Sequence, residues 1–169
     1  MVRARRCDHD CLAAFEIRPA RPEDARQLVE LFVAVACERD GIATEPPIDT
    51  EARQRQFAAA ADETIVAVSG GEVVGSLHVE PSRFGTAELG MAVARPWRGR
   101  GVGSALLAAA IDHGRSRGLH KLSLEVFPHN QAAIGLYRKF GFVEEGRHVK
   151  QYRRASGELW DSVDMGLLL

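Results

Sequence analysis

The sequence predicts a mixed α+β (α/β) fold, and three observations support this prediction. Segments that alternate apolar and polar residues are interspersed with segments whose apolar residues recur every three or four positions. Glycines and prolines separate these segments, and no linker, repeat or low-complexity tract divides the chain. A chain of 169 residues, 46% of them hydrophobic, is long enough for one domain with a real core. We therefore expect a single domain over residues 15–169, preceded by a flexible leader over residues 1–14.

The N-terminal half is expected to contain one strand, two helices and three further strands. Alternation over 15–18 predicts the first strand, and proline with acidic residues over 19–24 suits the start of a helix that continues to Ala36. Gly41 and the pair Pro46–Pro47 indicate a loop, after which Asp49 or Thr50 caps a second helix that ends near Ala61. The next strands are expected over 64–69, 72–79 and 86–93, with turns at 70–71 and 81–85.

The C-terminal half is expected to alternate helices and strands before it ends in a strand pair. A helix over 104–118 stops at Gly118, and a strand with a buried pattern follows over 121–127. Asn130 is a suitable cap for a helix that runs to Phe140, where Gly141 ends it. Two last strands, from Phe142 onward and over 160–168, are joined around residues 155–157.

The overall composition narrows the function and the compartment. The formal net charge of −1 gives no general attraction to nucleic acid or to an anionic membrane, and no apolar run approaches transmembrane length. Three cysteines imply no disulfide framework, so we predict a cytoplasmic protein. Cys7, His9 and Cys11 could contribute to a zinc site, but a fourth strong ligand is not visible. We interpret them as part of the leader and expect no metal.

A glycine-rich, arginine-containing loop lies between the expected strand at 86–93 and the expected helix at 104–118. Free N–H groups and the helix dipole make the start of a helix attractive to anions, and glycines let a phosphate approach the main chain closely. Arginine side chains add full positive charges. The candidate anion-binding residues are Arg98, Gly99, Arg100, Gly101, Val102, Gly103 and Ser104.

The spacing of the glycines distinguishes between the known phosphate loops. A dinucleotide-binding G-x-G-x-x-G pattern fails because Ser104 or Leu106 stands where the last glycine belongs, and no P-loop Gly-Lys-Ser/Thr occurs. Arg98, Gly101 and Gly103 instead fit Arg-x-x-Gly-x-Gly, which resembles the pyrophosphate loop of the GNAT N-acetyltransferase superfamily. The order of elements from residue 15 to 169 is similar to that family as well. The resemblance implies a mostly antiparallel sheet, splayed between its fourth and fifth strands and flanked by helices, that binds acetyl-CoA.

A second segment strengthens the resemblance. Residues 130–142 match the GNAT pattern Asn-x-x-Ala-x-x-Leu-Tyr-x-x-x-Gly-Phe at every fixed position, and Asn130 and Tyr137 share one helix face because they are two turns apart. The resemblance implies that Asn130 contacts the pantetheine arm and that the Tyr137 hydroxyl protonates the departing sulfur. It also implies that the main chain of Met91 and Val93 binds the arm and polarises the thioester. The expected chemistry is direct acetyl transfer to an amine.

The general base is less clearly indicated. Glu88 shares a strand face with Gly90 and Ala92, which leaves room for a substrate, so we predict that Glu88 is the base. Glu125, on the next strand, is the alternative, and bulk water is another. Three histidines could serve by their chemistry but look like loop or surface residues; they are His120, His129 and His148.

The acceptor is expected to be the primary amine of an amino-acid-like small molecule or of a peptide N-terminus. The segment 38–51 is acidic and would attract an ammonium group. The opposite wall is expected to be basic and to suit a carboxylate, through Arg147, Lys150, Arg153 and Arg154. A non-catalytic CoA-binding sensor is the alternative function, and a dehydrogenase domain, suggested by Glu125 at a strand end, is a weaker one. We also allow for a homodimer.

Overall fold

The computed structural model describes residues 14–169, so nearly all of the expected leader, with Cys7 and Cys11, lies outside the described residues. The strands within it are β1 (Glu16–Pro19), β2 (Thr64–Ser69), β3 (Glu72–Pro81), β4 (Thr86–Val93), β5 (Lys121–Val126), β6 (Val143–Arg153) and β7 (Leu159–Leu168). The longer helices are α1 (Ala25–Cys37), α2 (Thr50–Ala59), α3 (Val102–Ser116) and α4 (Gln131–Lys139). This order confirms the predicted mixed α+β fold.

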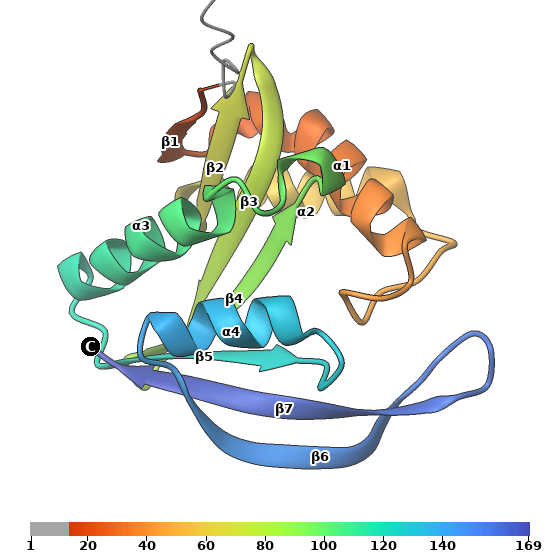
Figure 1. Cartoon of the computed structure of the whole chain (residues 1–169). Coiled ribbons are helices and arrows are strands. Elements are labelled where there is room, and N and C mark those ends of the chain that lie inside the picture. The colour runs from red at the N-terminus through yellow and green to blue at the C-terminus, as the bar shows by residue number, and fades with distance from the viewer. Residues whose placement is uncertain (1–13) are drawn as a thin grey trace, which may run out of the picture.

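The strands form one sheet in the order β1-β2-β3-β4-β5-β7-β6, and every neighbouring pair is antiparallel except β4 and β5. The parallel pairing of β4 with β5 extends only from Thr86–Lys121 to Glu88–Ser123. Beyond it the two strands diverge, as Figure 1 shows, and β5 continues alongside β7. The predicted splay is therefore present, and it lies in the middle of the sheet.

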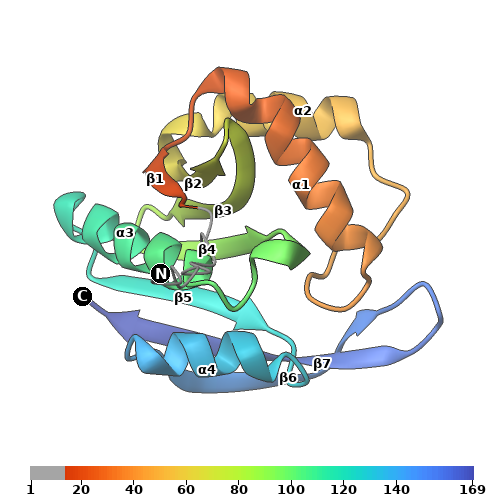
Figure 2. The ribbon, with the colours of Figure 1, turned by 45° about the horizontal axis from the view of Figure 1, so that its top comes forward.

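Helices cover both faces of the sheet (Figure 2), and the alternation of apolar residues explains how they pack. Leu106 and Leu107 of α3 are fully buried in the main core together with Leu89 of β4. On the opposite face, Val35 of α1 packs against Ala92 of β4. Odd- and even-numbered residues of β4 thus pack against different helices, as period-two strand geometry requires. By the same alternation, the side chain of Glu88 and the open position at Gly90 lie on the α1 face.

The start of α1 differs from the sequence prediction. Residues Pro22–Asp24 form a separate 3₁₀ turn, and the α-helix begins at Ala25. The buried Asp24 carboxylate accepts hydrogen bonds from Arg18 Nη1 at 2.7 Å and Nη2 at 2.8 Å, and from the Arg21 N–H at 2.8 Å. These bonds, Arg18 first, hold the pKa of Asp24 below its usual value. They fix the direction in which α1 leaves β1.

The last two strands form a long hairpin. The strand β7 is in register with β5 only over Val163–Leu168, and the rest of the hairpin extends past the end of β5. In Figures 1 and 2 its tip bends toward the segment that follows α1. Within residues 14–169, none of the helices combines the length and the apolar character needed to cross a membrane.

Candidate active site

The splay between β4 and β5 opens a cleft of about 700 Å³. Its walls come from β4, the loop after it, the first turn of α3, α4, β5, the last two strands and the segment after α1. Most of the predicted site residues line it, namely Glu88, Met91, Val93, Arg98, Gly99, Gly101, Gly103, Ser104, Glu125, Asn130 and Tyr137. The described residues contain no group of three or more His, Cys, Asp or Glu side chains arranged to hold a metal ion.

The loop before α3 presents main-chain donors to the cleft. Gly101 is the N-cap, with a φ of 86°, so α3 begins at Val102 rather than at the predicted position 104. The first bond of the helix runs from the Ala105 N–H to the Gly101 carbonyl at 3.0 Å. The N–H groups of the three residues between them therefore have no partner within the helix. A Cβ placed on Gly101 would meet nothing within 4 Å, so the space beside it is open. These features fit a phosphate-binding cradle.

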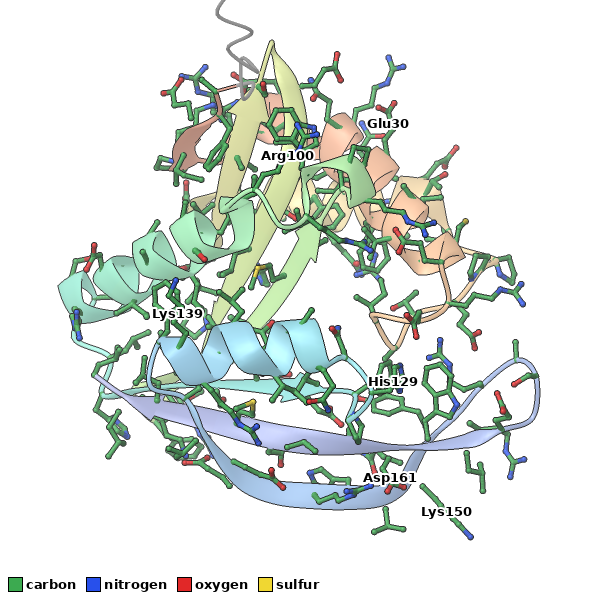
Figure 3. All side chains as sticks on the ribbon, in the orientation of Figure 1. Glu30, Arg100, His129, Lys139, Lys150 and Asp161 are labelled. Carbon is green, nitrogen blue, oxygen red and sulfur yellow. The ribbon has the colours of Figure 1, made fainter. Side chains whose placement is uncertain are left out.

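The other predicted loop residues have different positions. A Cβ on Gly103 would lie 3.1 Å from Leu136 Cδ2, so this glycine lets α3 pack closely against α4. Val102 is buried in the core and can offer only its main chain to a ligand. The guanidinium of Arg100 lies over the Trp97 ring, 5.6 Å from its centroid. Figure 3 shows Arg100 beside the upper part of β3, away from α4. Arg100 is not among the cleft-lining residues.

Arg98 connects two walls of the cleft. Its Nη1 and Nη2 donate to the two carboxylate oxygens of Glu38 at 2.7 and 2.9 Å, and its Nε donates to the Val93 carbonyl at 3.0 Å. The sequence predicted a phosphate contact for Arg98 but not this ion pair with the residue that follows α1. The pair leaves the main-chain donors as the groups that are free to bind an anion.

The main chain of β4 is exposed along the splay. The Ala94 N–H bonds to the Val74 carbonyl at 2.9 Å, so Ala94 faces β3. Because alternate residues of a strand direct their N–H and C=O groups to the same side, those of Met91 and Val93 face away from β3, toward the gap. Their side chains pack against the main core, as expected. This arrangement suits an extended ligand that binds along β4 like an added strand.

The two predicted residues of α4 lie on the same wall. Asn130 caps the helix, since its Oδ1 accepts from the Ala133 N–H at 3.2 Å, and it also lines the cleft. Tyr137 is 9% exposed and packs on Phe142, with the ring centroids 5.8 Å apart. Burial raises the pKa of the Tyr137 hydroxyl to about 12, so it keeps its proton at neutral pH.

On the α1 face of the splay, three polar side chains line the cleft together. Glu88 is exposed, and Glu125 and Tyr152 are half-buried. The Tyr152 hydroxyl donates to Glu125 Oε2 at 2.7 Å, while Glu125 Oε1 is buried without a hydrogen-bond partner. Burial raises the pKa of Tyr152 to about 12, and the bond to Glu125 and the nearby charge of Glu88 add to the rise. The structure thus brings both candidate bases together with a tyrosine that the sequence did not indicate.

The segment after α1 covers this end of the cleft. His129 Nε2 lies 3.0 Å from Asp40 Oδ1, and Figure 3 shows His129 at the start of α4. From the hairpin tip, Arg154 donates to the carbonyls of Ala43 at 2.9 Å and Arg39 at 3.3 Å. It is 4% exposed, and its guanidinium stacks over Trp160 at 4.4 Å. These contacts fix the covering segment to the hairpin.

The predicted basic wall is therefore wrong. Arg154 is buried in structural contacts, and Arg147 pairs with Asp161 at 2.7 Å. Lys150 extends away from the hairpin (Figure 3). Residues 147, 150, 153 and 154 are not among those that line the cleft. The acidic side is only partly confirmed, because Glu38 and Asp40 line the cleft but Glu38 is neutralised by Arg98.

Comparison with known families identifies the chain. The model of the acetyltransferase (GNAT) family matches residues 34–142, which contain the loop, the splay and α4. The chain belongs to the GNAT acetyltransferase family. It is therefore an N-acetyltransferase, and the recognition made from Arg98–Ser104 and from 130–142 is confirmed.

Two curated relatives of this GNAT protein are named for amino acids or their analogues. It is 36% identical over 106 residues to the L-amino acid N-acetyltransferase AaaT of Escherichia coli, a match that covers 60% of this chain and 65% of that protein. It is 31% identical over 140 residues to an L-methionine sulfoximine/L-methionine sulfone acetyltransferase of Pseudomonas paraeruginosa, covering 78% of this chain and 81% of the relative.

Solved structures share the fold over almost the whole domain. A ribosomal-protein-alanine N-acetyltransferase from Brucella melitensis is 29% identical, with a TM-score of 0.83 and coverage of 91% of this chain and 99% of that one. An acetyltransferase from Salmonella typhimurium, whose structure contains its cofactor acetyl-CoA, has a TM-score of 0.83 at 24% identity, with coverage of 92% and 94%. At that identity the second likeness shows the fold alone.

Two cleft residues of this GNAT protein, Tyr152 and Ser162, and the pairing of a third, Glu38, with Arg98 had no signal in the sequence. Tyr152 faces the cleft because the pairing of β6 with β7 is irregular between His148 and Tyr152, and such a shift changes which side chains share a face. Ser162 of β7 is fully buried in the cleft wall, and its hydroxyl has no partner. Glu38 lies 60 positions from Arg98 in sequence. The candidates His120, His129 and His148 are not among the cleft-lining residues.

Proposed function

We propose that this protein transfers the acetyl group of acetyl-CoA directly to the primary amine of an amino-acid-like small molecule or a peptide N-terminus. The observation that carries the proposal is that one cleft combines a phosphate cradle, an unpaired strand edge, a buried tyrosine and two carboxylates. Each group answers one requirement of acyl transfer: holding the thioester, stabilising the oxyanion, assisting the thiolate and deprotonating the amine.

The loop and β4 would position acetyl-CoA. The N–H groups of Val102, Gly103 and Ser104, with the α3 dipole, bind the pyrophosphate. The exposed main chain of Met91 and Val93, together with Asn130, binds the pantetheine arm, and a β4 N–H donates to the thioester oxygen as negative charge develops there. The Salmonella structure that contains acetyl-CoA has the same fold.

Tyr137 would assist the leaving sulfur. A thiol has a pKa of about 8.5, so the tyrosine, with a pKa of about 12, holds its proton more tightly than the thiol does. Its hydroxyl therefore acts first as a hydrogen-bond donor, one that strengthens as the carbon–sulfur bond breaks and negative charge collects on sulfur. The proton that the amine loses when the carbon–nitrogen bond forms balances the one that the thiolate gains.

Glu88 would remove the proton from the incoming ammonium. It is exposed in the cleft wall, so it can pass the proton to solvent after each turnover. Its strand position, two residues before Gly90, places its carboxylate on the α1 face of the splay. A Cβ on Gly90 would meet nothing within 4 Å, so this face has room for an acceptor beside Glu88.

The acceptor class is supported by charge and by the relatives. The carboxylates of Glu88 and Glu125 favour a cationic amine. The relatives named for L-amino acids and for L-methionine sulfone act on small molecules of this kind. Among the described residues that line the cleft, Arg98 is the only cation, and it is paired with Glu38. No unpaired cation of these residues is therefore available for the carboxylate of an amino acid. Comparing free amino acids with their amides tests whether the carboxylate contributes to binding.

The test is acceptor-dependent release of CoA from acetyl-CoA. The panel contains L-methionine sulfone, L-methionine, their amides and a short peptide with a free N-terminus. We expect release well above background hydrolysis with at least one acceptor, and an acetylated amine as the product. Tight acetyl-CoA binding without acceptor-dependent release would favour the sensor function. Failure to bind acetyl-CoA would contradict the proposal altogether.

A further inference from the structure

The half-buried Glu125 carboxylate has an unusual environment in the cleft wall. Its Oε2 accepts from Tyr152, but its Oε1 is shielded from solvent and has no hydrogen-bond partner. Among the ion pairs of residues 14–169, none involves Glu125. A carboxylate oxygen that is shielded from solvent and has no partner is costly, and a cationic ligand in the cleft would supply the missing partner.

The surroundings of Glu125 strengthen the electrostatic attraction between its carboxylate and a cationic ligand. The residue opposite it on β7 is Asp164, whose carboxylate is paired with His148 at 2.7 Å. The nearest strand on the other side contributes Glu88, through the pairing of Glu88 with Ser123. Because Oε1 is shielded from solvent, water screens the negative charge of Glu125 less than that of an exposed carboxylate, and this charge attracts a cation in the cleft.

Tyr152 connects this hidden charge to the open cleft. Its proton is used in the bond to Glu125 Oε2, so the lone pairs of the hydroxyl oxygen remain available to accept from a ligand. The pKa of Tyr152, raised to about 12, means that this donor stays protonated at neutral pH. Glu88 and Tyr152 line the same cleft, and Glu88 is in register with Ser123, two residues before the Glu125 that Tyr152 contacts.

We propose that Tyr152 and Glu88 form the subsite for the ammonium group of the acceptor, with Glu125 as the buried charge that holds Tyr152 in place and stabilises the cation. The ammonium donates one hydrogen bond to the Tyr152 oxygen and one to Glu88. The apolar residues Val35, Ala43 and Phe127 complete this wall and suit an acceptor with an apolar group next to its amine. The inference rests on the proposed function, because it assigns the acceptor side of the same cleft.

The two carboxylates therefore have different tasks. Glu88 contacts the ammonium, takes its proton and passes it to solvent. Glu125 takes no part in proton transfer; it is a positioning residue that acts through Tyr152 and through its charge. Replacing Glu125 is thus expected to weaken acceptor binding, whereas replacing Glu88 is expected to lower kcat.

The experiment measures binding separately from turnover. Calorimetric titration of the CoA complex uses L-methionine sulfone, L-phenylalanine amide and hexylamine, each compared with the same molecule lacking the amino group. We expect Glu125→Gln and Tyr152→Phe to weaken binding of the amines by about tenfold or more, the effect of losing one charge-assisted hydrogen bond. Binding of the desamino analogues and of CoA should be unchanged. Glu144→Gln, which alters an exposed carboxylate on β6, is the matched control.

The outcomes separate this inference from the proposed function. Equal losses for amines and desamino analogues would reduce Tyr152 and Glu125 to structural residues and overturn the subsite. Wild-type protein that binds no amine more tightly than its desamino analogue would overturn it as well, whatever the acetyl-CoA affinity. If CoA release from acetyl-CoA is acceptor-dependent but Glu125→Gln leaves amine binding intact, the acetyltransferase function stands and only the subsite fails.

Discussion

Replacing Gly101 with valine is expected to abolish acetyl-CoA binding. Gly101 has a φ of 86° and caps α3, and its missing Cβ leaves open the space where a pyrophosphate would approach the first N–H groups of the helix. A branched side chain there would block the approach and disturb the cap. Loss of two charge-assisted hydrogen bonds corresponds to at least about a hundredfold weaker binding.

Gly118 provides the matched control for this substitution. It too has a positive φ, of 70°, and a Cβ on it would meet nothing within 4 Å, but it follows the other end of α3. Gly118→Val therefore introduces similar backbone strain away from the cleft and should keep acetyl-CoA affinity. Calorimetric titration of both variants, with folding checked by circular dichroism, measures the difference. Undiminished affinity in a folded Gly101→Val protein would remove the loop from the binding site.

Replacing Tyr137 with phenylalanine is expected to lower kcat by about 10²–10⁴-fold with little change in acetyl-CoA affinity, the usual range for loss of a proton donor. The ring would keep its packing on Phe142, so only the hydroxyl is lost. The chain has two tyrosines, and the other, Tyr152, offers the comparison. Tyr152→Phe should act mainly on the KM for the acceptor. Near-normal kcat in Tyr137→Phe would mean that the thiolate is stabilised by another group.

Local sequence signals were sufficient for most of the fold and for the CoA side of the site. The Asn130 cap depends on a few neighbouring residues, and it lies where the sequence placed it. The α4 face that carries Asn130 and Tyr137 follows from helical periodicity alone. Boundaries were less accurate, because the turn at Pro22–Asp24 and the start of α3 depend on backbone geometry that composition does not specify.

The acceptor side could not be predicted because it is built from distant contacts. Arg154 looks like a surface cation in sequence, but it is buried by carbonyls from a segment more than a hundred positions away. Tyr152 meets Glu125 only because an irregular register on β6 turns it toward the cleft. Counting the charges of the acidic segment 38–51 and of the hairpin reveals neither contact. This is why the prediction of a basic wall opposite the acidic segment was wrong.

The central claim is that acetyl transfer is direct and takes place with both substrates in the cleft at the splay. The most direct measurement is the initial rate with varied acetyl-CoA at several fixed concentrations of the best acceptor. Direct transfer predicts double-reciprocal lines that intersect, and no acetylated protein by mass spectrometry when acetyl-CoA is present without acceptor. Parallel lines, together with an acetyl group on the protein, would contradict the account, because they require a covalent intermediate.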